Sequence, residues 1–223
     1  MIEFDGAAAG YGGRDVLAGV SLRLEPGSLH FLTGRSGAGK TTVLRLVYLA
    51  LRPAAGAVRV LGRDTREVGR TEEAALRRRM GVVLQECDLL DHMTVLENLV
   101  LPLRVAGKRG EPGPEAEELA RWVGLGKRLD AKPAELSAGE RQRAAIARAV
   151  VRNPDLVVAD EPTGNVDAEA AARIMGLFVE LNRLGKTVLI ATHDLNLMRA
   201  AKGSKASVLK VEGGRVERSG APL

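Results

Sequence analysis

The fold class of this chain is decided by Gly34-Arg35-Ser36-Gly37-Ala38-Gly39-Lys40-Thr41. This stretch fits the pattern G-x-x-x-x-G-K-[ST], in which glycines let backbone N–H groups converge on phosphate oxygens, the lysine neutralises phosphate charge and the hydroxyl can ligate Mg²⁺. An apolar run, Leu29 to Thr33, precedes the loop, and residues of helical character follow from Lys40 to about Leu51. In this strand–loop–helix context, a phosphate-binding loop is a far better interpretation than an ordinary glycine turn.

Two acidic residues stand at the end of another apolar strand. Leu156-Val157-Val158-Ala159 is apolar on both faces, as expected of a buried parallel strand, and Asp160-Glu161 follows it. A carboxylate at Asp160 can hold Mg²⁺ through water, and Glu161 can polarise an attacking water molecule. Acids kept there for the fold alone would be rare, because an unpaired charge in a core is costly. The pair is only moderately specific by itself, but together with the phosphate-binding loop it is a strong indication of phosphate chemistry.

The remaining pattern predicts an α/β fold with a parallel sheet. The first thirty residues read as short strands with tight turns, and the segment from Glu86 to Asn153 reads as helices only. The expected helices are 40–51, 71–80, 94–106, 115–123, 138–152, 168–184 and 194–201, with a connector at 107–114. The expected later strands are 57–61, 81–85, 156–160 and 187–192, followed by a hairpin of 207–211 and 215–217.

The organisation of the chain predicts a single domain over residues 1–223. A length of 223 residues suits one α/β domain and is short for two. Residues 1–85 and 154–223 are expected to form a nucleotide-binding core with an antiparallel β flap, and residues 86–153 a helical subdomain.

Composition and charge exclude several classes of protein. Hydrophobic residues make up 45%, and no run approaches the roughly 18 apolar residues of a membrane-spanning helix, so a soluble globular protein is expected. The single cysteine, Cys87, cannot form an internal disulfide, and the N-terminus lacks a signal-peptide pattern, so a reducing cytosol is expected. The net charge of +5 does not favour nucleic acid. Arg77-Arg78-Arg79 follows Glu72 and Glu73 on an expected solvated helix face, and only 3% of the residues are aromatic.

A third motif opens a helix in the middle of the chain. It reads Leu136-Ser137-Ala138-Gly139-Glu140-Arg141-Gln142-Arg143, in which Ser137 and Glu140 form the pattern of a capping box. A helix start with Ser and Gly can also bind an anion. Here the sequence resembles, over essentially its whole length, the ATP-binding subunits of ABC transporters, whose signature is L-S-G-G-Q. Ala138 and Glu140 depart from that signature, whereas Ser137 and Gly139, which meet the γ-phosphate in the family, are kept.

The resemblance implies a P-loop NTPase fold of the ABC ATPase type, with a RecA-like parallel-sheet core, an N-terminal antiparallel β subdomain and an inserted α-helical subdomain. It also implies ATP and Mg²⁺ as cofactors and hydrolysis of ATP to ADP and phosphate. Residues from Gly34 through Thr41 and Thr42 would bind the phosphates, with Thr41, Gln85 and Asp160 at the Mg²⁺ ion. Glu161 would be the base that activates water, with Gln85 and His193 assisting, the histidine on the γ-phosphate.

Two further positions follow from the same resemblance. Tyr11, in Gly10-Tyr11-Gly12-Gly13, matches the aromatic residue that stacks on adenine, whereas a lone loop tyrosine otherwise serves surface packing. Asp167, in Asn165-Val166-Asp167, matches the loop that crosses the interface between two subunits. The family arrangement is a head-to-tail homodimer closed over two ATP molecules, each held by the Lys40 loop of one subunit and the Ser137 segment of the other.

Within the family, the amino-acid sequence of three segments is most similar to the FtsE subgroup of bacterial cell-division ATPases. These segments are 31–40, 159–165 and 191–197. The resemblance implies an FtsX-like integral membrane partner, control of a peptidoglycan hydrolase across the membrane, and a peripheral location on the cytoplasmic face of the inner membrane. Glu140 is also similar to the LolD and MacB subgroups, which serve lipoprotein release and efflux, so these are the alternatives within the family.

Two other classes of protein fit less well. DNA-associated ATPases of the SMC type would suit the basic charge, but they carry a long coiled coil between the phosphate-binding loop and the signature. Only about a hundred residues, without sustained heptads, separate Lys40 from Leu136. A small-molecule kinase with the same loop would have no use for the segment from Ser137 to Gly139, and ATPase activity without any phosphate acceptor would set it aside.

The segment after Gln85 is expected to meet the membrane partner. It carries Leu89, Leu90 and Met93 without a β-turn signal, which favours an exposed apolar surface that moves with nucleotide state. The alternative is that these three side chains cover the core of the helical subdomain itself.

Overall fold

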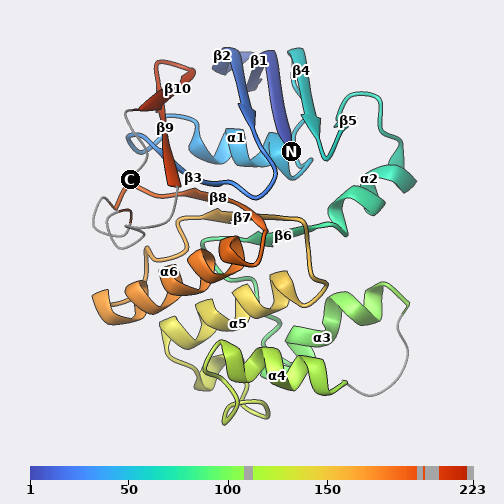
Figure 1. Cartoon of the computed structure of the whole chain (residues 1–223), viewed down its shortest axis with the longest axis vertical. Helices are drawn as coiled ribbons and strands as arrows, with labels where there is room; N and C mark the ends of the chain where they lie inside the picture. The colour runs from blue at the N-terminus through green and yellow to red at the C-terminus, as the bar shows by residue number, and fades with distance from the viewer. Residues whose placement is uncertain (108–112, 195–197, 199–205, 220–223) are drawn as a thin grey trace.

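The computed structural model describes residues 1–107, 113–194, 198 and 206–219, which form two β-sheets and the helices packed on them (Figure 1). One sheet has the strand order β2-β1-β4-β5, and the other has the order β10-β9-β3-β8-β7-β6. In the view of Figure 1 the first sheet stands at the top, the second crosses the middle, and α3, α4 and α5 lie at the bottom.

The first sheet is antiparallel and begins with two long strands. A two-residue turn joins β1 (Ile2–Tyr11) to β2 (Arg14–Leu24), and in it Gly12 and Gly13 have φ angles of 57° and 79°. Two positive φ angles match the twist of a hairpin, and glycine adopts them without steric cost. The prediction of short strands over the first thirty residues is therefore wrong, because one long hairpin spans most of this segment. The sheet is completed by β4 (Ala55–Val60) and by β5 (Arg63–Asp64), which the sequence pattern does not predict.

The second sheet is parallel except for its edge strand β10, which is antiparallel to β9. The carboxyl ends of parallel strands meet at one edge of a sheet, so the residues that follow β3, β6, β7 and β8 converge there. These residues include Gly34, Gln85, Glu161 and His193. The strands are β3 (Leu29–Thr33), β6 (Met80–Val83), β7 (Leu156–Asp160), β8 (Thr187–Ala191), β9 (Ala206–Glu212) and β10 (Arg215–Ser219).

Most predicted helices form with small shifts at their ends. The helix α1 (Lys40–Val47) is shorter than the predicted 40–51, because Leu49 takes a φ of 63° and the amides of Ala50 and Leu51 both bond to the carbonyl of Arg45. β6 also ends two residues earlier than predicted, which leaves Gln85 in the loop beyond it. The other helices are α2 (Arg70–Arg77), α3 (Val95–Val105), α4 (Pro114–Trp122), α5 (Ala138–Val150) and α6 (Ala168–Arg183), with a 3₁₀ turn η1 (Pro133–Glu135).

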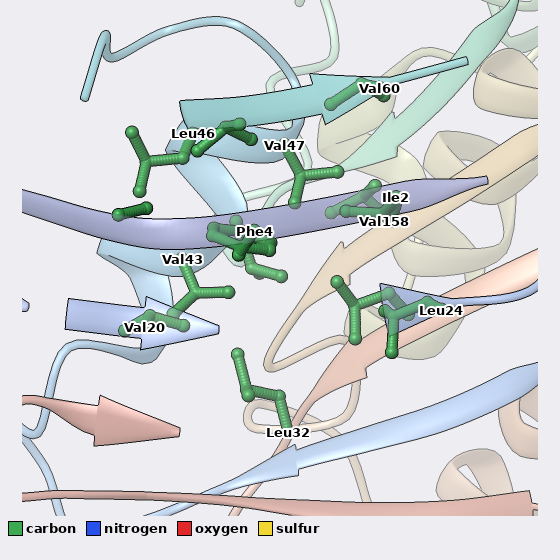
Figure 2. Close-up of a cluster of buried hydrophobic side chains, with 14 of the residues drawn as sticks. Ile2, Phe4, Val20, Leu24, Leu32, Val43, Leu46, Val47, Val60 and Val158 are labelled. Carbon is green, nitrogen blue, oxygen red and sulfur yellow. The ribbon is translucent and has the colours of Figure 1, made fainter. Parts of the chain in front are cut away.

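Three clusters of buried apolar side chains hold these layers together. The first lies between the two sheets around α1, and Figure 2 shows Phe4, Val43 and Val158 among its members. The second covers the other face of the parallel sheet with α5 and α6, where Phe178 is fully buried. The third lies inside the helical segment around Leu99. Because both faces of the parallel sheet are covered at its centre, β7 and β8 are continuous apolar runs rather than alternating ones.

Two predicted segments lie largely outside the described residues, namely the helix at 194–201 and the connector at 107–114. None of the helices in the described ranges combines the length and the apolar character that crossing a bilayer requires.

Candidate active site

The loop between β3 and α1 surrounds a buried lysine. Lys40 is the first residue of α1 and only 9% exposed, and its Nζ donates to the carbonyl oxygens of Gly34 at 3.0 Å and Arg35 at 3.5 Å. The same nitrogen lies 3.5 Å from Oε1 of Glu161. The backbone of the loop thus holds the ammonium group at its centre, where a charge-assisted bond to a phosphate oxygen is available.

The glycines of the loop allow a path that a side chain would block. Gly39 has a φ of 109°, and a Cβ there would lie 3.0 Å from Val16 and 3.1 Å from Leu17 of β2. Gly34 has a φ of 151°, and a Cβ there would lie 2.5 Å from the carbonyl oxygen of Val211. Gly39 is also the N-cap of α1 and supplies no side-chain cap. The first N–H groups of α1 are therefore free to bind an anion.

Two acids and a histidine stand at the carboxyl edge of the parallel sheet. Asp160 ends β7, and Glu161 follows with a φ of 44°, a conformation that costs energy for any residue with a side chain. The amide of Glu161 donates to the carbonyl of Ala191 at 2.9 Å, which ties this turn to the end of β8. His193 Nδ1 lies 3.0 Å from Oε2 of Glu161. The two carboxylate oxygens of Glu161 therefore face Lys40 on one side and His193 on the other.

The charge on Asp160 is poorly compensated by its neighbours. Burial raises the pKa of this carboxyl above its ordinary value, and the negative charge of Glu161 adds to the rise. A hydrogen bond with Thr41 and the positive charge of Lys40 oppose it. An additional cation beside Asp160 and Thr41 would favour the ionised form of the acid.

These groups line one pocket of about 350 Å³. Gln85 enters it from the loop beyond β6, and Tyr11 enters it from the end of β1. The Tyr11 ring is 43% exposed, and the guanidinium of Arg45 lies 5.8 Å from its centroid and donates to its hydroxyl at 3.3 Å. The structure thus brings together Tyr11, Val16, Ser36, Gly37, Gly39, Lys40, Thr41, Thr42, Gln85, Asp160 and Glu161.

Some predicted residues border this pocket without lining it. Gly34, Arg35 and Ala38 line a hollow of about 440 Å³ on the β9–β10 side of the loop. His193 reaches the pocket through its contact with Glu161. The loop is therefore open on two sides, and the side with Asp160 and Glu161 is the one that Lys40 and Thr41 also line.

Three predicted residues, Ser137, Gly139 and Asp167, lie elsewhere. Ser137 is the N-cap of α5: its Oγ accepts from the amide of Glu140 at 3.2 Å, and Oε2 of Glu140 accepts from the amide of Ser137 at 2.8 Å. Asp167 is the N-cap of α6 and accepts from the amide of Ala170 at 2.8 Å. A Cβ on Gly139 would lie 3.0 Å from the Cβ of Ala170. The starts of α5 and α6 therefore pack against each other and form one surface, away from the pocket.

The pocket fits a nucleoside triphosphate with Mg²⁺. Open N–H groups and Lys40 suit the phosphates, and the half-exposed ring of Tyr11 suits a stacked base. The Thr41 hydroxyl and the half-buried Asp160 carboxylate supply oxygen atoms, the ligand type that Mg²⁺ prefers.

The ABC transporter family model matches residues 17–164. This chain belongs to the ABC transporter family. The cell division ATP-binding protein FtsE of Escherichia coli K12 is 44% identical over 200 residues, which cover 89% of this chain and 90% of the relative. The protein of the same name from Haemophilus influenzae is 43% identical over 202 residues, which cover 89% and 93%.

Solved structures agree with the family assignment. The ATP-binding cassette MJ0796, in a dimeric post-hydrolysis state bound to ADP and Pi, has a TM-score of 0.87 and 31% identity, and the match covers 99% of this chain and 98% of that one. A second dimeric structure of this bacterial ABC transporter cassette matches with the same TM-score of 0.87 and 32% identity. The predicted ABC ATPase fold is confirmed, and so is the prediction of an ATPase that uses ATP and Mg²⁺.

The sequence pattern does not identify two residues at the site, and its prediction for Leu89 differs from the structure. Val16 lines the pocket and Arg45 covers the Tyr11 ring, but neither belongs to a motif, and only the packing of β2 and α1 brings them there. Leu89 is partly buried and packs against the apolar cluster of the helical segment, so for this residue the structure supports the alternative that it covers that cluster and not the prediction of an exposed apolar surface. Leu90 and Met93 are partly exposed.

Proposed function

We propose that this chain is the ATP-hydrolysing subunit of an FtsE-like membrane complex that acts in cell division through an FtsX-like membrane protein. The observation that carries the proposal is the convergence of Lys40, Thr41, Asp160 and Glu161 in one pocket, in a chain 44% identical to the cell division ATP-binding protein FtsE. One domain over residues 1–223 performs this work. Its core comprises residues 1–85 and 154–223, and its helical subdomain comprises residues 86–153.

Hydrolysis depends on the orientation of Glu161. Its carboxylate oxygens lie 3.5 Å from Nζ of Lys40 and 3.0 Å from Nδ1 of His193, so groups on both sides hold it in place. From this position the carboxylate accepts a proton from the water that attacks the γ-phosphate, while Lys40 and the N–H groups of α1 hold the phosphates. His193 contacts the γ-phosphate, and Gln85 orients the attacking water. Thr41, Gln85 and Asp160 would hold Mg²⁺, which would neutralise phosphate charge when bound.

A second copy of the chain completes each site. Ser137, Gly139 and Asp167 do not line the pocket of their own chain; Ser137 and Asp167 are exposed at the starts of α5 and α6, and the buried Gly139 packs between these two helix starts. In a head-to-tail homodimer, Ser137 and Gly139 of one subunit meet the γ-phosphate held by Lys40 of the other, and Asp167 crosses the interface. Tyr11 stacks on the adenine. The similar solved cassettes are dimeric, which supports this arrangement.

Coupling to the membrane runs through the segment that follows Gln85. Leu90 and Met93 are partly exposed there and offer apolar surface to an FtsX-like subunit. The chain would sit at the cytoplasmic face of the inner membrane through this contact, with no nucleic acid partner. Closing and opening of the dimer would pull on the membrane protein and control a peptidoglycan hydrolase. A LolD- or MacB-type role in lipoprotein release or efflux is the alternative.

The test is a double substitution, Leu90→Asp with Met93→Asp, in cells that rely on this chain. Co-purification with the FtsX-like protein should be lost, and the cells should grow as filaments, because charged side chains oppose burial in an apolar interface. ATP binding and the folded state, measured on the purified variant, should be retained. Leu184→Asp is the matched control, since Leu184 is 65% exposed at the end of α6. Normal division together with impaired lipoprotein release or efflux would refute the division role and favour the alternative.

A further inference from the structure

The loop that carries Gln85 continues into a strained turn. Cys87 and Asp88 are consecutive residues with φ angles of 63° and 44°, and neither is glycine. The amide of Asp88 donates to the carbonyl of Glu86 at 2.8 Å, which makes Cys87 the centre of the rarer, strained form of γ-turn. Such a conformation persists only where the surrounding structure holds it. The contacts that hold this turn therefore decide where Gln85 lies.

Arg148 of α5 holds both strained residues. Its Nη2 donates to the carbonyl of Cys87 and its Nη1 to the carbonyl of Asp88, each at 2.7 Å. No carboxylate pairs with this guanidinium in the described part of the chain. A planar fork with two parallel donors fits two adjacent carbonyls in a way that the point charge of a lysine does not.

Gln142, also on α5, makes a second connection to the same turn. The Sγ of Cys87 donates to Oε1 of Gln142 at 2.7 Å, and Gln142 is 4% exposed. Its Nε2 is one of the few buried polar atoms in the described ranges without a partner. A buried amide with an unsatisfied donor is costly, so this side chain is held in place at an energetic disadvantage. The hydrogen bond to the Cys87 thiol is what joins Gln142 to the turn.

The far end of the segment is fixed to a different helix. Asn98 of α3 is fully buried, its Nδ2 donates to the carbonyls of Leu90 and Met93, and its Oδ1 accepts from the amide of Leu90. The loop is thus anchored to α3 at residues 90 and 93 and to α5 at residues 87 and 88. Only the stretch from Leu84 to Glu86 lies between these anchors and the sheet, and the side chain of Gln85 is exposed at the pocket.

We infer that Arg148 and Gln142 are positioning residues that hold Gln85 in the ATP pocket and tie it to α5, the helix that begins at Ser137. Gln85 faces the nucleotide of its own chain, and Ser137 would serve the nucleotide of the other. Because one rigid helix carries Ser137, Gln142 and Arg148, a movement of either end is passed to the other. The inference rests on the proposed roles of Gln85 and Ser137.

The test is a double-mutant cycle between Arg148→Gln and Gln85→Ala, in the full-length protein. Arg148→Gln should lower kcat by about tenfold or more while the Kd for ATP changes by less than about twofold, because the pocket around Lys40 is untouched. In the Gln85→Ala background the same substitution should cause no further loss, since its effect acts through Gln85. Arg148→Lys should recover only part of kcat.

Arg152→Gln is the matched control. Arg152 also lies at the end of α5 and donates from Nη1 to a backbone carbonyl, that of Pro102 at 3.1 Å, but it does not touch the turn. Its kcat should stay within about twofold of the parent. An equal loss of kcat in Arg152→Gln, or losses that multiply in the double variant, would overturn the inference and leave Arg148 as a general support of the helical subdomain.

A second pair of variants keeps the test open if Arg148→Gln does not fold. Cys87→Ala removes the donor to Gln142, and Cys87→Ser keeps it, while both retain the same strained backbone position. Cys87→Ala should lower kcat about two- to fivefold and Cys87→Ser should restore it. Equal kcat in the two would count against the inference. An unchanged kcat in Gln85→Ala would refute the proposed role of Gln85 as well, whereas a loss in Gln85→Ala without one in Arg148→Gln would refute the positioning role alone.

Discussion

The N-termini of α1 and α5 are capped in opposite ways. At α1 the N-cap is Gly39, which offers no side-chain oxygen, and the open N–H groups stand beside Lys40 in a pocket with Asp160 and Glu161. At α5 the N-cap Ser137 forms a full capping box with Glu140, so each side chain accepts from the amide of the other.

This difference distinguishes a helix start that lines the pocket of its own chain from one that, in the proposed dimer, serves the pocket of the other subunit. N–H groups at a helix start need an acceptor, and at α1 no capping side chain provides one, so a bound phosphate can take that place directly. At α5 the cap already satisfies part of this need, so in the proposed dimer a phosphate from the other subunit would add to the existing bonds. Four predictions test this contrast.

The largest effect is expected in the pocket beside the start of α1, at Glu161. Glu161→Gln should lower ATP turnover by about a hundredfold or more, because a neutral amide cannot accept the proton of the attacking water. ATP binding should persist and the dimer should accumulate in its ATP-bound form, which phosphate release and size-exclusion chromatography with ATP would measure. Glu118→Gln is the control, since Glu118 is exposed on α4 and does not line the pocket. Turnover at the parent rate in Glu161→Gln would remove Glu161 as the base.

The next largest effect is expected at the start of α5, where Ser137 would serve the ATP of the other subunit. Ser137→Arg should abolish ATP-driven dimerisation and turnover but leave nucleotide binding to the isolated subunit intact, because Ser137 does not line the pocket of its own chain. Mixing Ser137→Arg subunits with Lys40→Ala subunits should restore at most one of the two composite sites. Full activity of Ser137→Arg alone would contradict the shared site and make the start of α5 a purely structural helix cap.

A matched pair separates the loss of a cap from the loss of a site. Thr94 caps α3 with the same kind of capping box, which it forms with Glu97. Ser137→Ala and Thr94→Ala should each lower the free energy of unfolding by about 1 kcal/mol. Only Ser137→Ala should also lower turnover. Equal turnover in the two variants would show that the cap, and no contact with nucleotide, is what Ser137 provides.

The smallest effect is expected at Glu140, where the family signature has glutamine. Hydrogen bonding from the Ser137 amide, with help from Arg128 at 3.2 Å, lowers the pKa of Glu140 below its ordinary value. A depressed folded-state pKa stabilises the fold above the unfolded pKa, and this stabilisation is lost as the pH falls through the folded value. Glu140→Gln keeps an acceptor for the Ser137 amide but removes the charge. It should therefore cost about 0.5 kcal/mol of unfolding free energy at pH 7 and nothing in strong acid.

The kcat of Glu140→Gln distinguishes a helix-capping role of Glu140 from a catalytic one. Glu140→Gln should keep kcat within about twofold of the parent, because the carboxylate caps its own helix and does not line the pocket. A tenfold change would show that the acidic variant of the signature takes part in the chemistry of the assembled site.

The sequence by itself determined the local parts of this protein. The phosphate-binding loop, the strand β7 with Asp160 and Glu161 at its end, and the cap at Ser137 were all predicted at the residues where they occur. Each depends on interactions within a few residues, such as the φ that only glycine adopts freely or the side-chain oxygen that caps the next turn. The ends of α1 and β6 were predicted less well, because neighbouring turns and not propensity end them.

Only the tertiary structure decided the distances between these parts. The approach of Lys40 and His193 to Glu161, and the hold of Arg148 on the turn after Gln85, join residues that lie far apart in the chain. These contacts follow from the strand order β3-β8-β7-β6 and from the apolar layers on both faces of the sheet. A local pattern specifies which face of a strand is buried, but it does not specify which strand is its neighbour. The positions of these side chains relative to one another are therefore set by packing across the whole chain.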